Sequence, residues 1–242
     1  MPNSYPLVFT VGAMASLLWL ALVKPIRENP ISTFAPIVRF DAGLSALAGG
    51  LAGARAAFVA LHADYFASRP VEALWVWEGG LSWVGGALGA VLGLALYCAL
   101  ARRPFWPLAD ALACPATLMA LTAWSACLLD GCAYGRRAEA SLLAPLTQDI
   151  FGGVSHRWPT QAAGAVSSIG AFAGLQRLSG LSRNPGVLAS LSVAMIAAAA
   201  LALSFTRGDP VASVSGLRLD AVTSAGILLV AVLALAARSR RR

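Results

Sequence analysis

Charged residues are scarce in this sequence. Asp, Glu, Lys and Arg together make up 12% of its 242 residues, whereas 58% are hydrophobic and the mean hydropathy is +0.72. Ordinary soluble domains carry charge on about a quarter of their residues. This composition excludes an ordinary soluble domain and indicates a membrane protein.

Residues that commonly bind metals are also few. There are two histidines and four cysteines, with no CxxC pair and no His/Cys spacing typical of a zinc site. We therefore expect neither a metal nor another cofactor. Cys98 and Cys114 lie in or beside apolar runs, which predicts small core residues. Cys127 and Cys132 are close in sequence, and both a redox role and an inert role stay open for them.

Several functional classes lack their sequence signals. The chain has no internal repeat and no pair of broken helices, which disfavours a transporter. Ser82 has no GxSxG frame, which disfavours an intramembrane serine protease. No nucleic-acid-binding motif accompanies the net charge of +7, so we expect no nucleic-acid partner and attribute the charge mostly to membrane topology.

Apolar runs long enough to cross about 30 Å of hydrocarbon recur along the whole chain. They predict an all-α, polytopic helical bundle of about seven transmembrane helices, formed by a single integral membrane domain over residues 1–242. Glycine and alanine dilute the apolar signal of the fifth and seventh runs. The predicted spans are Tyr5–Val23, Ala42–Leu61, Gly79–Leu100, Ala111–Leu129, Pro159–Gln176, Gly186–Phe205 and Ala221–Ala237.

Basic residues gather at alternate ends of these runs, and this pattern predicts the orientation. Under the positive-inside rule, the N-terminus lies outside and the C-terminus lies in the cytoplasm. The positive charges follow the first apolar run instead of preceding it, so this run is not a signal peptide. The basic residues are Lys24, Arg27, Arg102, Arg103, Arg177, Arg183 and the final "ARSRRR".

Arginines also occur on the outward side, against this rule. Arg55 lies inside the second predicted span, where a charge costs about 2.5–3.5 kcal/mol. It either reaches the outer headgroups or pairs with Asp64 or Glu78, or it belongs to an anion site, since a guanidinium grips phosphate through two hydrogen bonds. The other outward arginines are Arg136, Arg137, Arg157, Arg207 and Arg218.

Six segments, in order, resemble motifs of the prolipoprotein diacylglyceryl transferase family. "YPLVFTVGA" from Tyr5 resembles the family's opening segment, and "GAR" at Gly53–Arg55 resembles its second-helix motif. "EGGLSWVGG" resembles GG[MLI]S[FW]HGG, and "LLDGCAYGRR" resembles the signature R-x-G-[NC]-F-x-[NA]-G-x-x-[YW]-G. "HRWPTQ" resembles RHP[ST]Q, and "TRGDP" matches the arginine-bearing segment before the last helix. The resemblance extends over nearly the full length of the chain.

This resemblance implies a transferase of lipoprotein biosynthesis in the bacterial cytoplasmic (inner) membrane. Members of the family transfer the diacylglyceryl group of phosphatidylglycerol, in the lipid bilayer, to the lipobox cysteine thiol that follows a prolipoprotein signal peptide. We expect Arg207, Tyr5, Asp130 and His156 to serve catalysis. The expected substrate-binding residues are Arg55, Gly131, Tyr134, Gly135, Arg136, Arg157 and Gln161.

Three family positions carry other residues here. The histidine of the third-helix motif is Val84, and the arginine that opens the signature is Trp124, whereas the asparagine or cysteine three positions further on falls on Cys127. The middle histidine of RHP[ST]Q is Trp158, with His156 two positions earlier. These replacements favour a second hypothesis, in which a paralogue binds phosphatidylglycerol or carries out another glycerophospholipid transfer.

Overall fold

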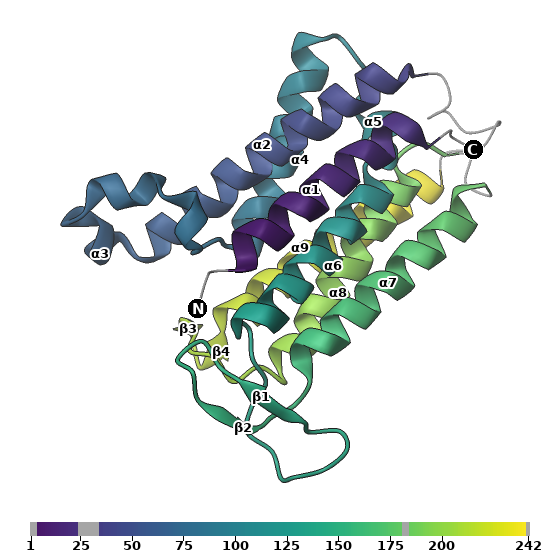
Figure 1. Ribbon diagram of the computed structural model, residues 1–242. Coiled ribbons are helices and arrows are strands. Elements are labelled where there is room, and N and C mark those ends of the chain that lie inside the picture. Colours follow the sequence, from purple (N-terminus) through teal and green to yellow (C-terminus); the bar gives the residue numbers. More distant parts are fainter. Residues whose placement is uncertain (1–3, 24–33, 181–183, 241–242) are drawn as a thin grey trace.

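The protein is a bundle of long helices with irregular segments at one end (Figure 1). A computed structural model describes residues 4–23, 34–180 and 184–240. The predicted topology markers Lys24, Arg27 and Arg183 lie outside the described residues. The start of the first helix and the end of the last helix lie at opposite ends of the bundle (Figure 1).

Six described helices are long and apolar enough to cross a membrane. The remaining predicted span, the fifth along the chain, is also a helix, α7 (Thr160–Ser179), but its composition is less apolar than that of the other six. It runs beside α6 and α8 (Figure 1). The prediction of a polytopic helical membrane protein is therefore confirmed. The six helices are α1 (Ser4–Leu22), α2 (Pro36–Leu61), α4 (Trp83–Leu100), α6 (Ala113–Asp130), α8 (Val187–Ser204) and α9 (Leu219–Ser239).

Helices α2 and α4 pack together through facing glycines. A Cβ atom placed on Gly49 would lie 2.4 Å from the carbonyl oxygen of Gly89, and one on Gly89 would lie 2.2 Å from that of Gly49. Gly53 and Gly85 form the same reciprocal contact one turn along. Small residues are needed here because helices in lipid associate through close backbone packing.

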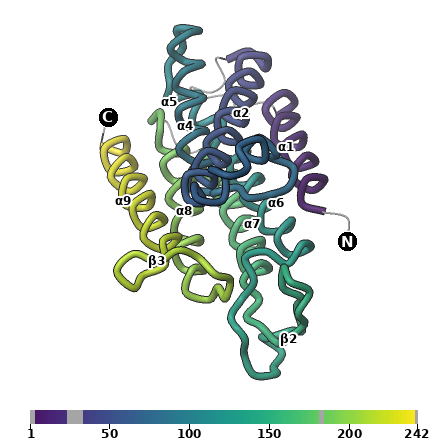
Figure 2. Tube along the Cα trace, turned by 90° about the vertical axis from the view of Figure 1, so that its left-hand side faces the viewer, coloured from purple at the N-terminus to yellow at the C-terminus, as the bar shows by residue number. Residues whose placement is uncertain are grey.

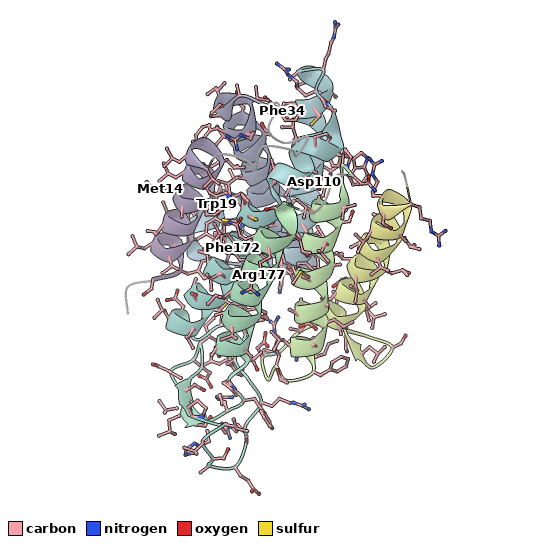
Figure 3. The ribbon with its side chains drawn as sticks, turned by 90° about the vertical axis from the view of Figure 1, so that its right-hand side faces the viewer. Met14, Trp19, Phe34, Asp110, Phe172 and Arg177 are labelled. Carbon is pink, nitrogen blue, oxygen red and sulfur yellow. A yellow bond between two sulfur atoms is a disulfide. The ribbon has the colours of Figure 1, made fainter. Side chains whose placement is uncertain are left out.

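The other long helices meet through aromatic and small side chains. On α1, Trp19 contacts Phe172 of α7 edge to face, with ring centroids 5.1 Å apart (Figure 3). On α6, the indole of Trp124 packs so closely on α7 that a Cβ atom at Gly164 would lie 2.2 Å from it. Helix α7 is thus part of the bundle.

A short helix, α5 (Phe105–Ala111), fixes the start of α8. The buried carboxylate of Asp110 accepts hydrogen bonds from the backbone N–H groups of Gly186 (2.7 Å) and Ala189 (2.8 Å). Burial raises the pKa of the Asp110 carboxyl, against the lowering effect of these two hydrogen bonds. A negative charge at this place also complements the positive end of the α8 dipole.

Two irregular segments lie at the end of the bundle opposite to the end of α9 (Figures 1 and 2). The first, which we call the arm (residues 62–82), contains α3 (Ala63–Ala67) and two 3₁₀ helices, η2 (Pro70–Leu74) and η3 (Val76–Glu78). The second, which we call the lobe (residues 131–159), contains the antiparallel strands β1 (Leu146–Gln148) and β2 (Val154–His156), with Thr147 opposite Ser155. A smaller hairpin precedes α9 and consists of β3 (Ser213–Val214) and β4 (Leu217–Arg218).

A disulfide between Cys127 and Cys132 joins the last turn of α6 to the lobe, with the two Cα atoms 4.6 Å apart. Sequence reasoning left the state of these two cysteines open. Disulfides are typical of oxidising compartments, which agrees with the predicted outward orientation of this end of the bundle. Free Cys98 is buried, as predicted, and free Cys114 is half-buried.

The glycine contact between α2 and α4 can be tested by substitution. We expect Gly89→Leu to force the two helices apart and to lower the free energy of unfolding by about 1–3 kcal/mol, the usual penalty of overpacking. The measurement is a thermal unfolding curve of the purified protein in detergent.

Gly170→Leu on α7 is the matched control, because a Cβ atom there meets no other atom within 4 Å. The same side chain added at this exposed position leaves the unfolding temperature unchanged or raises it. Equal losses of stability in the two variants would contradict the packing described for α2 and α4.

Candidate functional site

Three loop segments run side by side at the lobe end of the bundle: the ones after α6, before α7 and after α8. The backbone N–H of Arg136 donates to the carbonyl of Thr206, and the N–H of Gly208 donates to that of Tyr134, both at 2.8 Å. On the other side, the N–H of Trp158 donates to the carbonyl of Arg136 at 3.1 Å. The segment around Arg136 therefore lies between the other two, which are distant in sequence.

Two of the predicted glycines permit this arrangement. Gly131 ends α6 with a φ of 73°, a left-handed conformation typical of a glycine at a helix C-terminus. At Gly135 a Cβ atom would lie 2.0 Å from the carbonyl oxygen of Trp158. Sequence reasoning expected both glycines to bind substrate; in the structure Gly131 lets the chain turn and Gly135 lets the backbone of Trp158 come close.

These segments line an open, polar cavity of about 300 Å³. Three arginines and one aspartate contribute to its walls, so positive charge predominates. The cavity brings together three of the predicted substrate-binding residues, Tyr134, Arg136 and Arg157. The complete lining is Tyr134, Arg136, Arg137, Asp149, Arg157 and Gly208.

Arg157 forms a fixed wall of the cavity. It is 4% exposed, its Nη2 donates to the carboxylate of Asp149 at 2.6 Å, and its guanidinium lies 4.5 Å from the ring centre of Tyr134. The same carboxylate accepts the backbone N–H groups of Phe151 and Gly153. Within the described ranges, the buried Nε of Arg157 has no hydrogen-bond partner, which leaves one donor for a ligand or for water.

Arg136 and Arg137 differ from Arg157 in that both are exposed. In the part of the chain that the structure describes, neither guanidinium forms an ion pair or a hydrogen bond with another residue. Each therefore keeps its full set of donors. Such a pair of free guanidinium groups beside a polar cavity suits an anion with several oxygen acceptors, such as a phosphate.

Arg207, a predicted catalytic residue in the "TRGDP" segment, does not line this cavity. It forms a two-pronged ion pair with Asp209 and a second contact with Asp220 at 3.4 Å. Arg218 approaches both carboxylates as well, so two arginines and two aspartates form one neutral cluster. Burial alone would lower the pKa of Arg207, but the hydrogen bonds and charge of Asp209 and the charge of Asp220 raise it.

Arg55 is likewise remote from the cavity lining, and its partners are backbone carbonyls. Its guanidinium donates to the carbonyls of Glu72, Ala73, Gly79 and Gly80, at 2.6–3.2 Å. Sequence reasoning expected a carboxylate partner, a headgroup or an anion; the structure shows instead that Arg55 holds the arm. A guanidinium with five donors satisfies several carbonyls of an irregular segment at once.

Tyr5 and Asp130 lie together at the lobe end of α1, although not in the cavity lining. The carboxylate of Asp130 accepts the backbone N–H groups of Ser4 (3.0 Å) and Tyr5 (2.8 Å). It therefore caps the N-terminus of α1 and ties it to the end of α6. The two catalytic candidates thus meet through the Tyr5 backbone and not through its phenol.

His156 and Gln161 also serve the lobe. Nδ1 of His156 lies 2.7 Å from the carbonyl oxygen of Ala144, a geometry in which this nitrogen donates. Gln161 is 2% exposed and donates from Nε2 to the carbonyl of Cys132 at 2.8 Å. Neither side chain lines the cavity, so their predicted roles in chemistry gain no support from this geometry.

Sequence reasoning assigned no site role to Arg137, Asp149 or Gly208. Arg137 was visible only as the second member of an arginine pair. Asp149 precedes "IFGG", a composition typical of a turn in which the aspartate accepts nearby backbone N–H groups. Gly208 had no signal beyond its place in "TRGDP", because its role depends on a neighbouring loop.

Comparison with known proteins gives a consistent result. A family model described as prolipoprotein diacylglyceryl transferase matches residues 3–237. A phosphatidylglycerol–prolipoprotein diacylglyceryl transferase of Paramagnetospirillum magneticum is 27% identical over 227 residues, which cover 85% of this chain and 82% of that protein. Proteins of the same name from Bacillus licheniformis (33% identical) and Rickettsia rickettsii (30%) match 48% and 58% of this chain and 40% and 59% of their own lengths.

The wall formed by Arg157 depends on Asp149. We expect Asp149→Ala to leave a buried guanidinium without its counter-charge, a change that typically costs about 3–5 kcal/mol, and to loosen the lobe. Limited proteolysis followed by mass spectrometry checks this, with faster cleavage expected within residues 138–156.

Glu139→Ala is the matched control, because Glu139 is an exposed acid of the same lobe. It removes the same charge and leaves the cleavage rate unchanged. An Asp149→Ala protein with the proteolysis pattern of the parent would show that the ion pair does not hold the lobe together.

Proposed function

Because the chain belongs to the prolipoprotein diacylglyceryl transferase family, we propose that it transfers the diacylglyceryl group of phosphatidylglycerol to the lipobox cysteine thiol of a prolipoprotein. Family membership rests on the match over residues 3–237. The protein is a multi-pass membrane protein, and the family makes the bacterial cytoplasmic membrane its expected location. We also propose that residues 1–242 form one integral membrane domain, with the N-terminus outside.

The observation that carries this proposal is the cavity at the helix ends. It contains two free guanidinium groups, those of Arg136 and Arg137, beside the partnered Arg157. The backbone of Arg136 is only a few residues from the end of α6, so a lipid whose acyl chains stay in the membrane is within reach of the site. In our proposal the arginines hold the phosphate of phosphatidylglycerol.

The reaction needs charge stabilisation more than a dedicated base. The substrate thiolate attacks a glyceryl carbon, a carbon–sulfur bond forms, and the carbon–oxygen bond to glycerol phosphate breaks. Negative charge grows on the departing phosphate, and preorganised positive groups are typically the largest catalytic contribution in such a case. A free thiol with a pKa of about 8.5 is a few per cent ionised near neutral pH, and a positive field raises that fraction.

A second candidate function is lipid binding without this transfer, or with another glycerophospholipid transfer. Two polar residues of the family motifs, a histidine and an arginine, are replaced here by Val84 and Trp124. The indole of Trp124 fills the space against Gly164 of α7, which supports a packing role at the position of the signature arginine. In this case the cavity arginines still hold an anionic lipid.

A transfer assay separates the two candidates. Purified protein is incubated with phosphatidylglycerol and a lipobox peptide, and the peptide mass is measured. An increase equal to one diacylglyceryl group supports the transferase, whereas co-purified lipid without any increase supports the binding protein.

We expect the double variant Arg136→Ala, Arg137→Ala to reduce retained phosphatidylglycerol at least about tenfold, since each charge-assisted hydrogen bond contributes about 1.5–3 kcal/mol. Arg103→Ala, an exposed arginine at the opposite end of the bundle, is the control and keeps the lipid. Unchanged lipid retention in the double variant would remove these arginines from the headgroup site. Retention of phosphatidylglycerol by Arg207→Ala tests separately whether Arg207, which the sequence predicts to be catalytic, belongs to the lipid site.

The replaced family positions give a further prediction. We expect the double variant Val84→His, Trp124→Arg to raise the transfer rate by about 10²-fold or more, the size typical of one added donor at a developing charge. The readout is the initial rate of peptide lipidation, and Trp124→Ala is the control that opens the same space without adding a charge. A rate no higher than that of the parent would argue that these positions do not limit transfer here.

A further inference from the structure

The arm carries a row of exposed apolar side chains. Val71 is 65% exposed, Leu74 is 75% exposed and Trp77 is 58% exposed. Val71 and Leu74 lie three residues apart in η2, and in a 3₁₀ helix residues three apart lie above one another on the same side. Trp77 follows in η3, after the non-helical Trp75. We call these three residues the apolar row. Large apolar side chains that share one exposed face indicate an interaction surface.

A polar row follows the same spacing. Two of its members, Arg69 and Glu72, come two positions before Val71 and Leu74. The third, Glu78, comes one position after Trp77. The phenol of Tyr65 links two of them, because it donates to the carboxylate of Glu72 at 2.6 Å and accepts from Arg69 at 2.9 Å. In η2, Glu72 therefore lies on a different side from Val71 and Leu74.

The arm is connected at both of its ends to a membrane-spanning helix. It leaves α2 after Leu61 and enters α4 at Trp83, and both helices are apolar enough to span a membrane. The return is fixed where the N–H of Ser82 donates to the carbonyl of Ala54 at 3.0 Å. The arm stands out sideways from this end of the bundle (Figure 1). Because Ser82 pairs with Ala54, α4 begins about two turns before the end of α2 at Leu61.

The arm is held in this position by its own small core. Phe66 is buried, and the guanidinium of Arg55 lies 5.3 Å from its ring centre and 5.7 Å from that of Phe58. The hydrogen bonds of Arg55 to the arm carbonyls add to this contact. The members of the apolar row are each more than half exposed, so they are not covered by the bundle.

We propose that the arm lies in the membrane–water interface, with Val71, Leu74 and Trp77 inserted among the lipids at the boundary of headgroups and acyl chains. Lipid is the expected partner because the arm connects two helices that are long and apolar enough to span a membrane. Tryptophan favours this depth, and a short element with one charged and one apolar side is the form that interfacial segments take. This inference does not depend on the transfer reaction.

Fluorescence quenching tests the depth of Trp77. The parent protein and Trp77→Phe are reconstituted in vesicles of phosphatidylcholine and phosphatidylglycerol, and the difference between their emission spectra gives the contribution of Trp77. We expect lipids brominated near the glycerol end of the acyl chain to quench it several-fold more than aqueous iodide does. Bromine near the methyl end quenches it less.

A charge on the apolar row supplies an independent measurement. We expect Leu74→Asp to lower the lipid quenching of Trp77 several-fold and to raise iodide quenching, whereas Ser68→Asp, which adds the same charge at an exposed position off the row, changes neither. Quenching of parental Trp77 by iodide and not by brominated lipid would overturn the proposal. Protection from both quenchers would also overturn it, because the row would then be covered by protein.

Discussion

A guanidinium removed from water requires partners from the protein, because an unpaired buried charge costs several kcal/mol. This constraint sorts the arginines at the arm and lobe end. Arg55 has backbone carbonyls, Arg157 has a carboxylate and an aromatic ring, and Arg207 has two carboxylates. Arg136 and Arg137 stay exposed. Among these described arginines, Arg136 and Arg137 offer their whole guanidinium groups to a ligand, and Arg157 offers its unpartnered Nε.

Much of the fold follows from the sequence, since membrane-spanning helices are set by apolar length and by the backbone hydrogen bonds that lipid enforces. The predicted end at Leu61 and the predicted end at Leu100 are both found. The site was less predictable. Tyr134, Arg136 and Arg157 were expected to meet and do line one cavity, because their motifs flank adjacent helix ends.

The missed features share a physical cause: they depend on contacts between loops and not on local pattern. The partners of Arg55 are carbonyls, which every residue possesses, so no side chain in the sequence marks them. Arg207 was expected to serve catalysis. Its main partner, Asp209, is visible in the same "TRGDP" segment, whereas its second partner, Asp220, lies beyond a hairpin. Trp124 differs, since its replacement of an arginine is visible in the sequence, yet only the close contact with Gly164 shows that the indole fills the space between two helices.

The arm also explains why an arginine, and not a lysine, occupies position 55. Two 3₁₀ helices and two glycines with positive φ, Gly79 and Gly80, leave carbonyls that their own segments do not satisfy. The planar guanidinium reaches four of them in different directions from Nε, Nη1 and Nη2, whereas an ammonium group has three donors on one atom. Burying the charge of Arg55 in a membrane helix costs free energy. The same charge satisfies backbone carbonyls that would also cost free energy if they were left unpaired. The cost of burying Arg55 and the cost of building an irregular arm at the membrane surface offset each other, which ties the second helix and the arm into one unit.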